Sequence, residues 1–140
     1  MKRAFTLLEL IVVIIILGIL ATLGLTQYGR MVERSRGAEA KAIVGDIRKL
    51  ATAYRLERGN LTGFTAANAN IGTAADQIPS ACAASHYFNY GVAAAGNVVT
   101  ITATRCTVNG KTPNGTTAGT LTLASDLSTG IDTWGGTGGY

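Results

Sequence analysis

Residues 10–25 read LIVVIIILGILATLGL, and no charged residue occurs between Leu10 and Gly29. A helix of about twenty residues rises about 30 Å, which is enough to cross the hydrocarbon core of a bilayer. A secretory signal would have a shorter apolar core, followed by a cleavage site of small residues. Ala21-Thr22-Leu23 is a poor site of that kind. The run therefore predicts a membrane-spanning helix rather than a signal that is removed.

The helical pattern continues past the apolar run and is amphipathic over residues 28–58. Apolar residues recur there at steps of three and four, which places them on one helix face. They are Ala40, Ile43, Val44, Ile47, Leu50, Ala51 and Tyr54. Glu33–Arg36 and Asp46–Lys49 are pairs of opposite charge at the helical spacing of three residues. One face of this half therefore needs to be covered by the rest of the chain.

A typical helix end follows, with basic residues before Gly59-Asn60. The sequence predicts one helix from about Phe5 to about Arg58. Glycines at positions 18, 24, 29, 37 and 45 are its weak points, because each interior Gly costs up to about 1 kcal/mol relative to Ala. Gly18 and Gly24 lie inside the apolar run, where any local unwinding would occur.

The composition changes after Gly59. Residues 60–84 are rich in Ala, Asn, Thr and Gly and predict a loop region. Residues 86–90, 97–104 and 120–123 have strand-like patterns, and the last two alternate apolar residues with Thr. The end of the chain, residues 134–140, has few side chains to pack. We expect an antiparallel sheet packed across Ala40–Tyr54, which is an α+β architecture with a protruding hydrophobic half-helix.

Charge is distributed unevenly along the chain. The formal net charge is +4 and the pI about 9.3, but Arg105 and Lys111 are the only basic residues beyond Gly59. The head is therefore nearly neutral, and the basic residues flank the membrane segment, where they help to set topology. We expect no specific nucleic-acid partner, since two basic residues are a thin basis for binding DNA.

Two cysteines, Cys82 and Cys106, lie in the expected head. They do not form a C-x-x-C motif, and metal-ligand partners are absent nearby. In an exported domain the natural interpretation is one disulfide bond. The alternative is a pair of free, buried thiols.

The N-terminal segment resembles the class III signal of type IV prepilins and type II secretion pseudopilins. Residues 1–10 read MKRAFTLLEL. In that family a short basic leader is cleaved before a Phe, and Phe-Thr-Leu-x-Glu and an apolar run follow. The family usually has Gly before the cleavage site, where this chain has Ala4. The resemblance covers about the first third of the chain, and the head matches only in general plan.

The resemblance implies four segments: a leader (1–4), a transmembrane and filament-core helix (5–29), an amphipathic half-helix (30–58) and the head (59–140). It implies cleavage between Ala4 and Phe5 by a prepilin peptidase, N-methylation of Phe5, and contact with the pilus assembly machinery. The protein would lie in the inner membrane before assembly and then in an extracellular filament of identical subunits.

Glu9 is a carboxylate at the edge of the apolar run, where burial of an unpaired charge is costly. We expect it to pair with the α-amino group of Phe5 in a neighbouring subunit and to set axial register, with Thr6 beside it. The alternative is a carboxylate that reaches the membrane interface.

The leading functional hypothesis is a major pilin for adhesion, motility or surface contact. The alternatives are a type II secretion pseudopilin, a minor pilin that binds DNA, and a monomeric single-span protein. The sequence has no catalytic motif, so we expect no enzyme activity and no cofactor. Asp126 and Asp132 could gather around calcium, but two carboxylates are too few to be specific, and we prefer a solvated turn and no metal. We expect the single histidine, His86, to be a packing residue.

Overall fold

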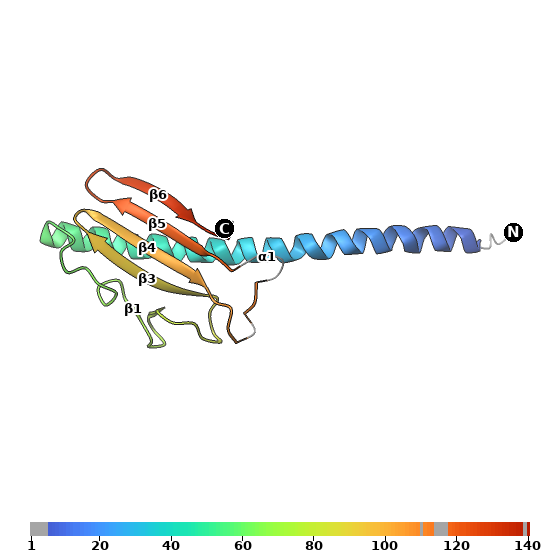
Figure 1. Ribbon diagram of the computed structural model, residues 1–140, viewed down its shortest axis with the longest axis horizontal. Helices are drawn as coiled ribbons and strands as arrows, with labels where there is room; N and C mark the ends of the chain where they lie inside the picture. The colour runs from blue at the N-terminus through green and yellow to red at the C-terminus, as the bar shows by residue number, and fades with distance from the viewer. Residues whose placement is uncertain (1–5, 110, 114–117, 139) are drawn as a thin grey trace.

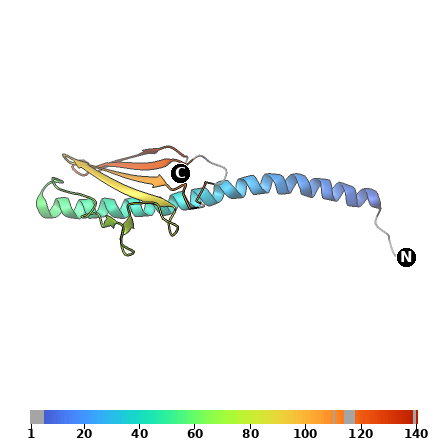
Figure 2. The ribbon, with the colours of Figure 1, turned by 60° about the horizontal axis from the view of Figure 1, so that its bottom comes forward.

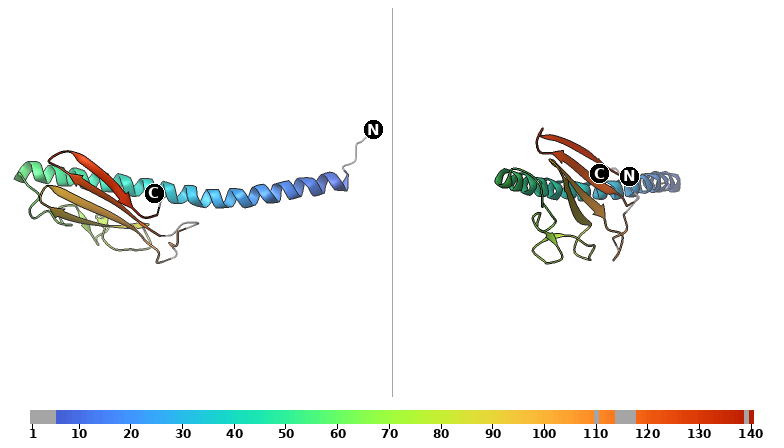
Figure 3. Two further views of the ribbon diagram at one scale, coloured as in Figure 1. Left: turned by 45° about the horizontal axis from the view of Figure 1, so that its top comes forward. Right: turned by 60° about the vertical axis from the view of Figure 1, so that its left-hand side comes forward.

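One long helix organises the chain. In the computed structural model, which describes residues 6–109, 111–113, 118–138 and 140, α1 (Leu7–Arg58) runs unbroken for 52 residues. The predicted start at about Phe5 lies outside the described residues, and the helix begins at Leu7 with Thr6 as its N-cap. The head covers only the C-terminal part of α1, and the N-terminal part extends away from it (Figure 1). Figure 3 shows that the protruding part curves gently.

The C-terminal end of α1 lies where the sequence predicts it. Gly59 has a φ of +79°, a left-handed conformation that Gly adopts without steric cost. Its N–H donates a 2.7 Å hydrogen bond to the carbonyl oxygen of Arg55. Arg55 and Arg58 lie in the last turn, where positive charge is favourable.

The head contains a four-stranded antiparallel sheet in the order β3-β4-β5-β6. The strands are β3 (Phe88–Ala95), β4 (Val98–Arg105), β5 (Thr120–Asp126) and β6 (Ile131–Gly136). The sheet lies along one side of the C-terminal half of α1 (Figures 1 and 2). The predicted α+β class is therefore confirmed.

Three of the four strands of this sheet were predicted, and the predicted ranges 97–104 and 120–123 agree closely with β4 and β5. The first strand lies at 88–95 rather than 86–90, because the Gly/Ala-rich residues after Tyr90 pair with β4 in full register. Strand β6 was not predicted, because its sequence IDTWGG does not alternate apolar with polar residues and ends in two glycines. It forms because each of its residues from Ile131 to Gly136 pairs with β5.

Residues 60–84 are not only a loop. They contain two short parallel strands, β1 (Ile71–Gly72) and β2 (Ile78–Pro79). Four of their side chains are buried in the core, namely Leu61, Phe64, Ala69 and Ile71. Figure 2 shows this segment on the side of α1 away from the sheet. The helix is thus covered on two flanks.

The core lies between α1 and the inner face of the sheet. The helix contributes Ala40, Val44, Ile47 and Ala51, all fully buried. Alternate residues of β4 and β5 face them, and Val99, Ile101, Ala103, Leu121 and Leu123 are at most 4% exposed. The predicted packing of the sheet across the amphipathic half of the helix is confirmed.

Removing the Ile101 side chain tests this core. Ile101 is fully buried and pairs with Leu123 on β5, so Ile101→Ala should lower the free energy of unfolding of the head by about 2–5 kcal/mol. Urea titration of the full chain in detergent, followed by fluorescence of the single tryptophan, Trp134, measures it. Thr104→Ala on the exposed face of the same strand is the control and should cost less than about 1 kcal/mol. Equal losses in both variants would contradict the assigned core.

Candidate functional site

The protruding part of α1 is apolar on every side and exposed throughout. Large side chains from Leu7 to Leu25 are between 42% and 74% exposed. By length and composition α1 can cross a membrane, and none of its apolar window is buried by the head. A helix that is hydrophobic all round needs either lipid or other protein around it. This segment is therefore the first part of the candidate functional site.

Glu9 has a local partner in the structure. Its Oε2 atom accepts hydrogen bonds from the Thr6 backbone N–H (2.9 Å) and the Thr6 hydroxyl (2.8 Å). The Glu9 N–H donates in turn to the Thr6 hydroxyl oxygen at 3.3 Å, which completes a capping box. Sequence reasoning treated Glu9 as a carboxylate without a nearby partner, and Thr6 supplies one. Within the described residues its Oε1 atom accepts no hydrogen bond, and it lies at the end of the helix where Phe5 precedes Thr6.

Gly18 and Gly24 do not interrupt α1. An added Cβ at either position would meet nothing within 4 Å, so the sites are open on the helix surface. Thr22 donates its hydroxyl hydrogen to the Gly18 carbonyl oxygen at 2.9 Å, and Thr26 donates to that of Leu23. Such side-chain bonds to preceding carbonyls slightly destabilise and bend helices. The predicted weak points thus coincide with a helical, but locally perturbed, part of the apolar segment.

The predicted disulfide bond between Cys82 and Cys106 is present, with a Cα–Cα distance of 5.6 Å. It joins the segment before β3 to the residue after β4. His86 lies in the segment so constrained, and its ring nitrogens contact the Ala81 carbonyl (2.6 Å) and the Ser85 hydroxyl (3.1 Å). The histidine therefore holds local structure, as its expected packing role requires.

A buried ion pair joins the helix to the sheet where α1 leaves the head. Arg105 at the end of β4 donates from Nε to Glu33 Oε2 and from Nη2 to Glu33 Oε1, both at 3.0 Å. Glu33 is 2% exposed and Arg105 3%. Arg105 also donates to the Cys106 carbonyl oxygen at 2.6 Å, next to the disulfide bond. A bidentate pair of this kind fixes both position and orientation.

Further cations surround this pair. Arg36 donates to Glu33 Oε1, and its guanidinium lies 3.9 Å from the centre of the Tyr87 ring. Lys111 lies 3.9 Å from the same ring. Burial opposes ionisation of Glu33, but hydrogen bonds and charge attraction from Arg105 and Arg36 outweigh it and hold the Glu33 pKa below its ordinary value.

Sequence reasoning found the Glu33–Arg36 pair and missed Arg105. A signal was present, because Arg105 continues the alternation of Val99, Ile101 and Ala103, all of which face the core. An arginine in such a position needs a buried carboxylate. Its burial also removes one of the two basic residues on which the DNA-binding alternative rested.

The two aspartates near the last hairpin have separate roles. Asp126 accepts from the Ser128 N–H (2.8 Å) and hydroxyl (2.6 Å), which stabilises the turn and lowers the Asp126 pKa. Asp132 lies in β6 and accepts from Ser125 (2.6 Å) and from Arg48 on α1 (2.9 Å), and these bonds lower the Asp132 pKa. The expected solvated turn is right for Asp126 and wrong for Asp132. In the described ranges no group of three or more His, Cys, Asp or Glu side chains could hold a metal.

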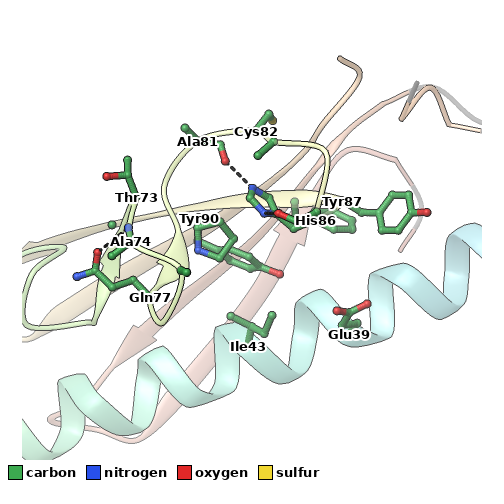
Figure 4. A pocket seen from close by; sticks show the side chains of 16 residues that line it. Glu39, Ile43, Thr73, Ala74, Gln77, Ala81, Cys82, His86, Tyr87 and Tyr90 are labelled. Atoms are coloured by element: carbon green, nitrogen blue, oxygen red, sulfur yellow. Dashed lines mark hydrogen bonds between the residues drawn. The ribbon is translucent and has the colours of Figure 1, made fainter. Parts of the chain in front are cut away.

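A pocket of about 550 Å³ lies between α1 and the segment that precedes β3 (Figure 4). Glu39 and Ile43 line it from the helix, and Tyr90 and His86 line it from the head. Burial and the nearby Glu39 charge raise the Tyr90 pKa. Glu39 is the only charged side chain among the described residues that line this pocket.

Residues 1–25 match the family model described as the prokaryotic N-terminal methylation motif. This motif is the class III signal of type IV pilins and pseudopilins, and here the long apolar helix follows it. The chain therefore has the N-terminal signal of these proteins, followed by a long apolar helix. The match ends within the apolar run and does not reach the head. No solved structure matches the chain.

Truncating Glu33 tests the ion pair. Glu33→Ala leaves Arg105 buried without its carboxylate, which should lower the free energy of unfolding of the head by about 3–5 kcal/mol. Trp134 fluorescence in urea, with the full chain in detergent, measures the change. Arg36→Ala is the control, because Arg36 is the more exposed partner, and it should cost about 1 kcal/mol or less.

The pH dependence of the same variants gives a second measurement. The Glu33 pKa lies below its ordinary value of about 4.3, so its ionised form stabilises the fold above that pH. The stabilisation is lost as pH falls through the lower, folded-state pKa. Glu33→Gln should therefore lose less stability than wild type between about pH 5 and pH 3. Asp126 and Asp132 remain, so some acid sensitivity should persist, and an unchanged profile would contradict the assigned role of Glu33.

Proposed function

We propose that this chain is a major pilin that polymerises through its N-terminal hydrophobic helix into an extracellular filament for adhesion, motility or surface contact. The observation that carries the proposal is the exposure of the large apolar side chains from Leu7 to Leu25, which the head leaves uncovered. Burial of apolar surface is worth about 25 cal/mol per Å², so these side chains favour lipid before assembly and neighbouring helices after it. The prepilin-type signal implies processing by a prepilin peptidase and assembly into a pilus-type polymer.

In this proposal residues 1–4 are the leader, residues 5–29 enter the membrane and later the filament core, residues 30–58 carry the head, and residues 59–140 form it. Cleavage falls between Ala4 and Phe5, and the new amino group of Phe5 is methylated. Both residues lie outside the described part of the chain. The Oε1 atom of Glu9 accepts no hydrogen bond from the residues that the structure describes, which supports a pairing with that amino group in a neighbouring subunit. Gly18 and Gly24, with the threonine bonds near them, are where the helix would unwind on packing.

The related alternatives differ in the polymer they form. A pseudopilin would form a short periplasmic polymer of a type II secretion system. The disulfide bond and the separate roles of Asp126 and Asp132, which leave no complete calcium loop in the described residues, favour the pilin. A minor pilin that binds DNA would need a basic tip, and burial of Arg105 disfavours it.

Electron microscopy of sheared surface material and intact mass of the subunit test the proposal together. We expect long filaments built mainly from this chain, with a subunit that lacks Met1 to Ala4 and carries one added methyl group. Short periplasmic polymers with no surface filament would support the pseudopilin instead. A subunit that retains the leader in mature filaments would contradict the processing step.

Replacing Glu9 separates insertion from assembly. Glu9→Leu removes a charge from the apolar segment, so the subunit should accumulate in the membrane at least as well as wild type. It also leaves the Phe5 amine of a neighbour unpaired, which typically costs about 3–5 kcal/mol at each contact. We therefore expect normal membrane levels with sharply fewer filaments, measured by immunoblot and by quantification of sheared filaments.

Two variants separate the charge of Glu9 from its capping role. Glu9→Gln keeps a capping box with Thr6 but loses the charge, and it should assemble poorly. Thr6→Ala removes the cap, at about 0.5–2 kcal/mol of helix stability, but keeps the carboxylate, and it should still form filaments. Wild-type filament yield with Glu9→Leu would reduce Glu9 to an interfacial carboxylate.

A further inference from the structure

The exposed side of α1 within the head carries two stripes of opposite charge. The basic stripe comprises Arg34 and Lys41, and the acidic stripe comprises Glu39 and Asp46. Because each helical residue turns by about 100°, the members of each stripe lie within about 20° of each other, and the stripes are about 140° apart. All four side chains are exposed. The helix therefore presents one sign of charge on each flank.

The surface between the stripes carries three small residues, with the exposed Lys49 one to three turns further along the same line of the helix. Ala38 and Ala42 are exposed there, and Gly45 is half-buried. They face away from the sheet, because the core residues Ala40, Val44 and Ile47 lie on the opposite side of α1. Small side chains allow the axes of two packed helices to approach within about 8–10 Å. Long charged side chains on the two flanks could then reach a neighbouring helix.

Most of these charges have no partner among the described residues. In the part of the chain that the structure describes, Arg34, Glu39 and Lys41 form no ion pair or side-chain hydrogen bond. Asp46 pairs only with Lys49 on its own helix, at 2.7 Å, and both residues are well exposed. An exposed pair of this kind is worth less than about 1 kcal/mol and exchanges readily. The stripes are thus available to a second molecule.

The two stripes share one spacing. Glu39 follows Arg34 by five residues, and Asp46 follows Lys41 by five. A parallel copy displaced by five residues, about 7.5 Å along the helix axis, therefore places both acids level with both bases. The contact uses different flanks of the two copies, so it can repeat without closing. A helical polymer repeats one displacement between neighbouring subunits, and here one displacement aligns both ion pairs.

We propose that the acidic stripe of one copy binds the basic stripe of the next in this parallel, staggered contact, with Glu39 opposite Arg34 and Asp46 opposite Lys41. The inference rests on the proposed polymerisation and adds to it the lateral contact that sets the spacing of the heads. The displacement is one residue longer than the four-residue step from Phe5 to Glu9 in the sequence. Glu39 also lines the pocket of Figure 4.

Charge reversal in the full chain tests the contact, because every copy in a homopolymer carries both stripes. Arg34→Glu and Glu39→Arg each place like charges opposite each other, and each should lower filament yield about fivefold or more. The double variant restores the pair in the reverse sense and should return the yield to within about twofold of wild type. Membrane accumulation and urea unfolding of the subunit should stay unchanged, since both side chains are exposed.

Two controls test the spacing itself. Glu57 lies 18 residues, five full helical turns, after Glu39, and Thr52 stands five residues before it. Glu57→Arg therefore makes the same charge change on the same line of the helix without a cationic partner, and it should assemble normally. Combining Arg34→Glu with Asp46→Arg creates two repulsions at the proposed displacement, and it should assemble worse than Arg34→Glu alone.

The outcomes separate this inference from the proposed function. Absence of filaments from the wild-type chain would overturn the proposed function itself. Wild-type filaments together with normal assembly of Arg34→Glu would overturn only the contact. Failure of the double reversal to restore filaments, or equal damage from Glu57→Arg, would also overturn it. Loss of the single-variant defect at about 1 M salt, where charges are screened beyond about 3 Å, would support it.

Discussion

The contact between one face of α1 and the inner face of the sheet is the constraint on which the rest of the structure depends. Ala40, Val44, Ile47 and Ala51 are fully buried beneath β4 and β5. Leu61, Phe64, Ala69 and Ile71 from the segment before β3 complete the same core. Because the buried residues of α1 begin at Gly29, the large apolar side chains from Leu7 to Leu25 remain outside the head. The same packing therefore stabilises the head and leaves the assembly segment exposed.

The buried Glu33–Arg105 pair marks the border between those two parts. On one side of it the helix is covered by the sheet, and on the other, beyond the turn that contains Gly29, lies the exposed apolar run from Leu7 to Leu25. Neither charge could be buried alone, since an uncompensated ion in a protein interior costs several kcal/mol. The pair thus requires the end of β4 and one turn of α1 to be in register. Removing either group affects both the head and the direction in which the free helix leaves it.

The sequence predicted those parts whose signal is local. The apolar run, the helix end at Gly59, the apolar stripe of residues 40–54 and the alternating strand β4 all follow from periodicity and from the residues that flank them. The disulfide bond followed from two cysteines in a domain expected to be exported. Motif residues such as Glu9 were found because the N-terminal pattern is fixed in register.

The parts that were missed depend on contacts distant in sequence. Strand β6 has no alternating pattern and forms by pairing with β5. The core role of Phe64 cannot be recognised within an Ala- and Asn-rich segment. Arg105 and Asp132 find their partners on α1 across 72 and 84 residues respectively. No local pattern specifies which cation meets which acid. The capping bonds of Glu9 are local, because Thr6 and Glu9 have the three-residue spacing of a capping box. They were missed because Glu9 was interpreted only as a charge for pairing between subunits.

The disulfide bond has a mechanical consequence for a protein loaded along its helix. Cys82 and Cys106 are 24 residues apart, and both β3 and β4 lie between them. If tension separated these strands, the covalent bond would still bypass the segment between them. At about 3.3–3.6 Å per extended residue, the disulfide bond prevents on the order of 80 Å of extension in the segment between the two cysteines of each subunit. A pulled head could loosen at its later strands while its first hairpin stayed at nearly fixed length.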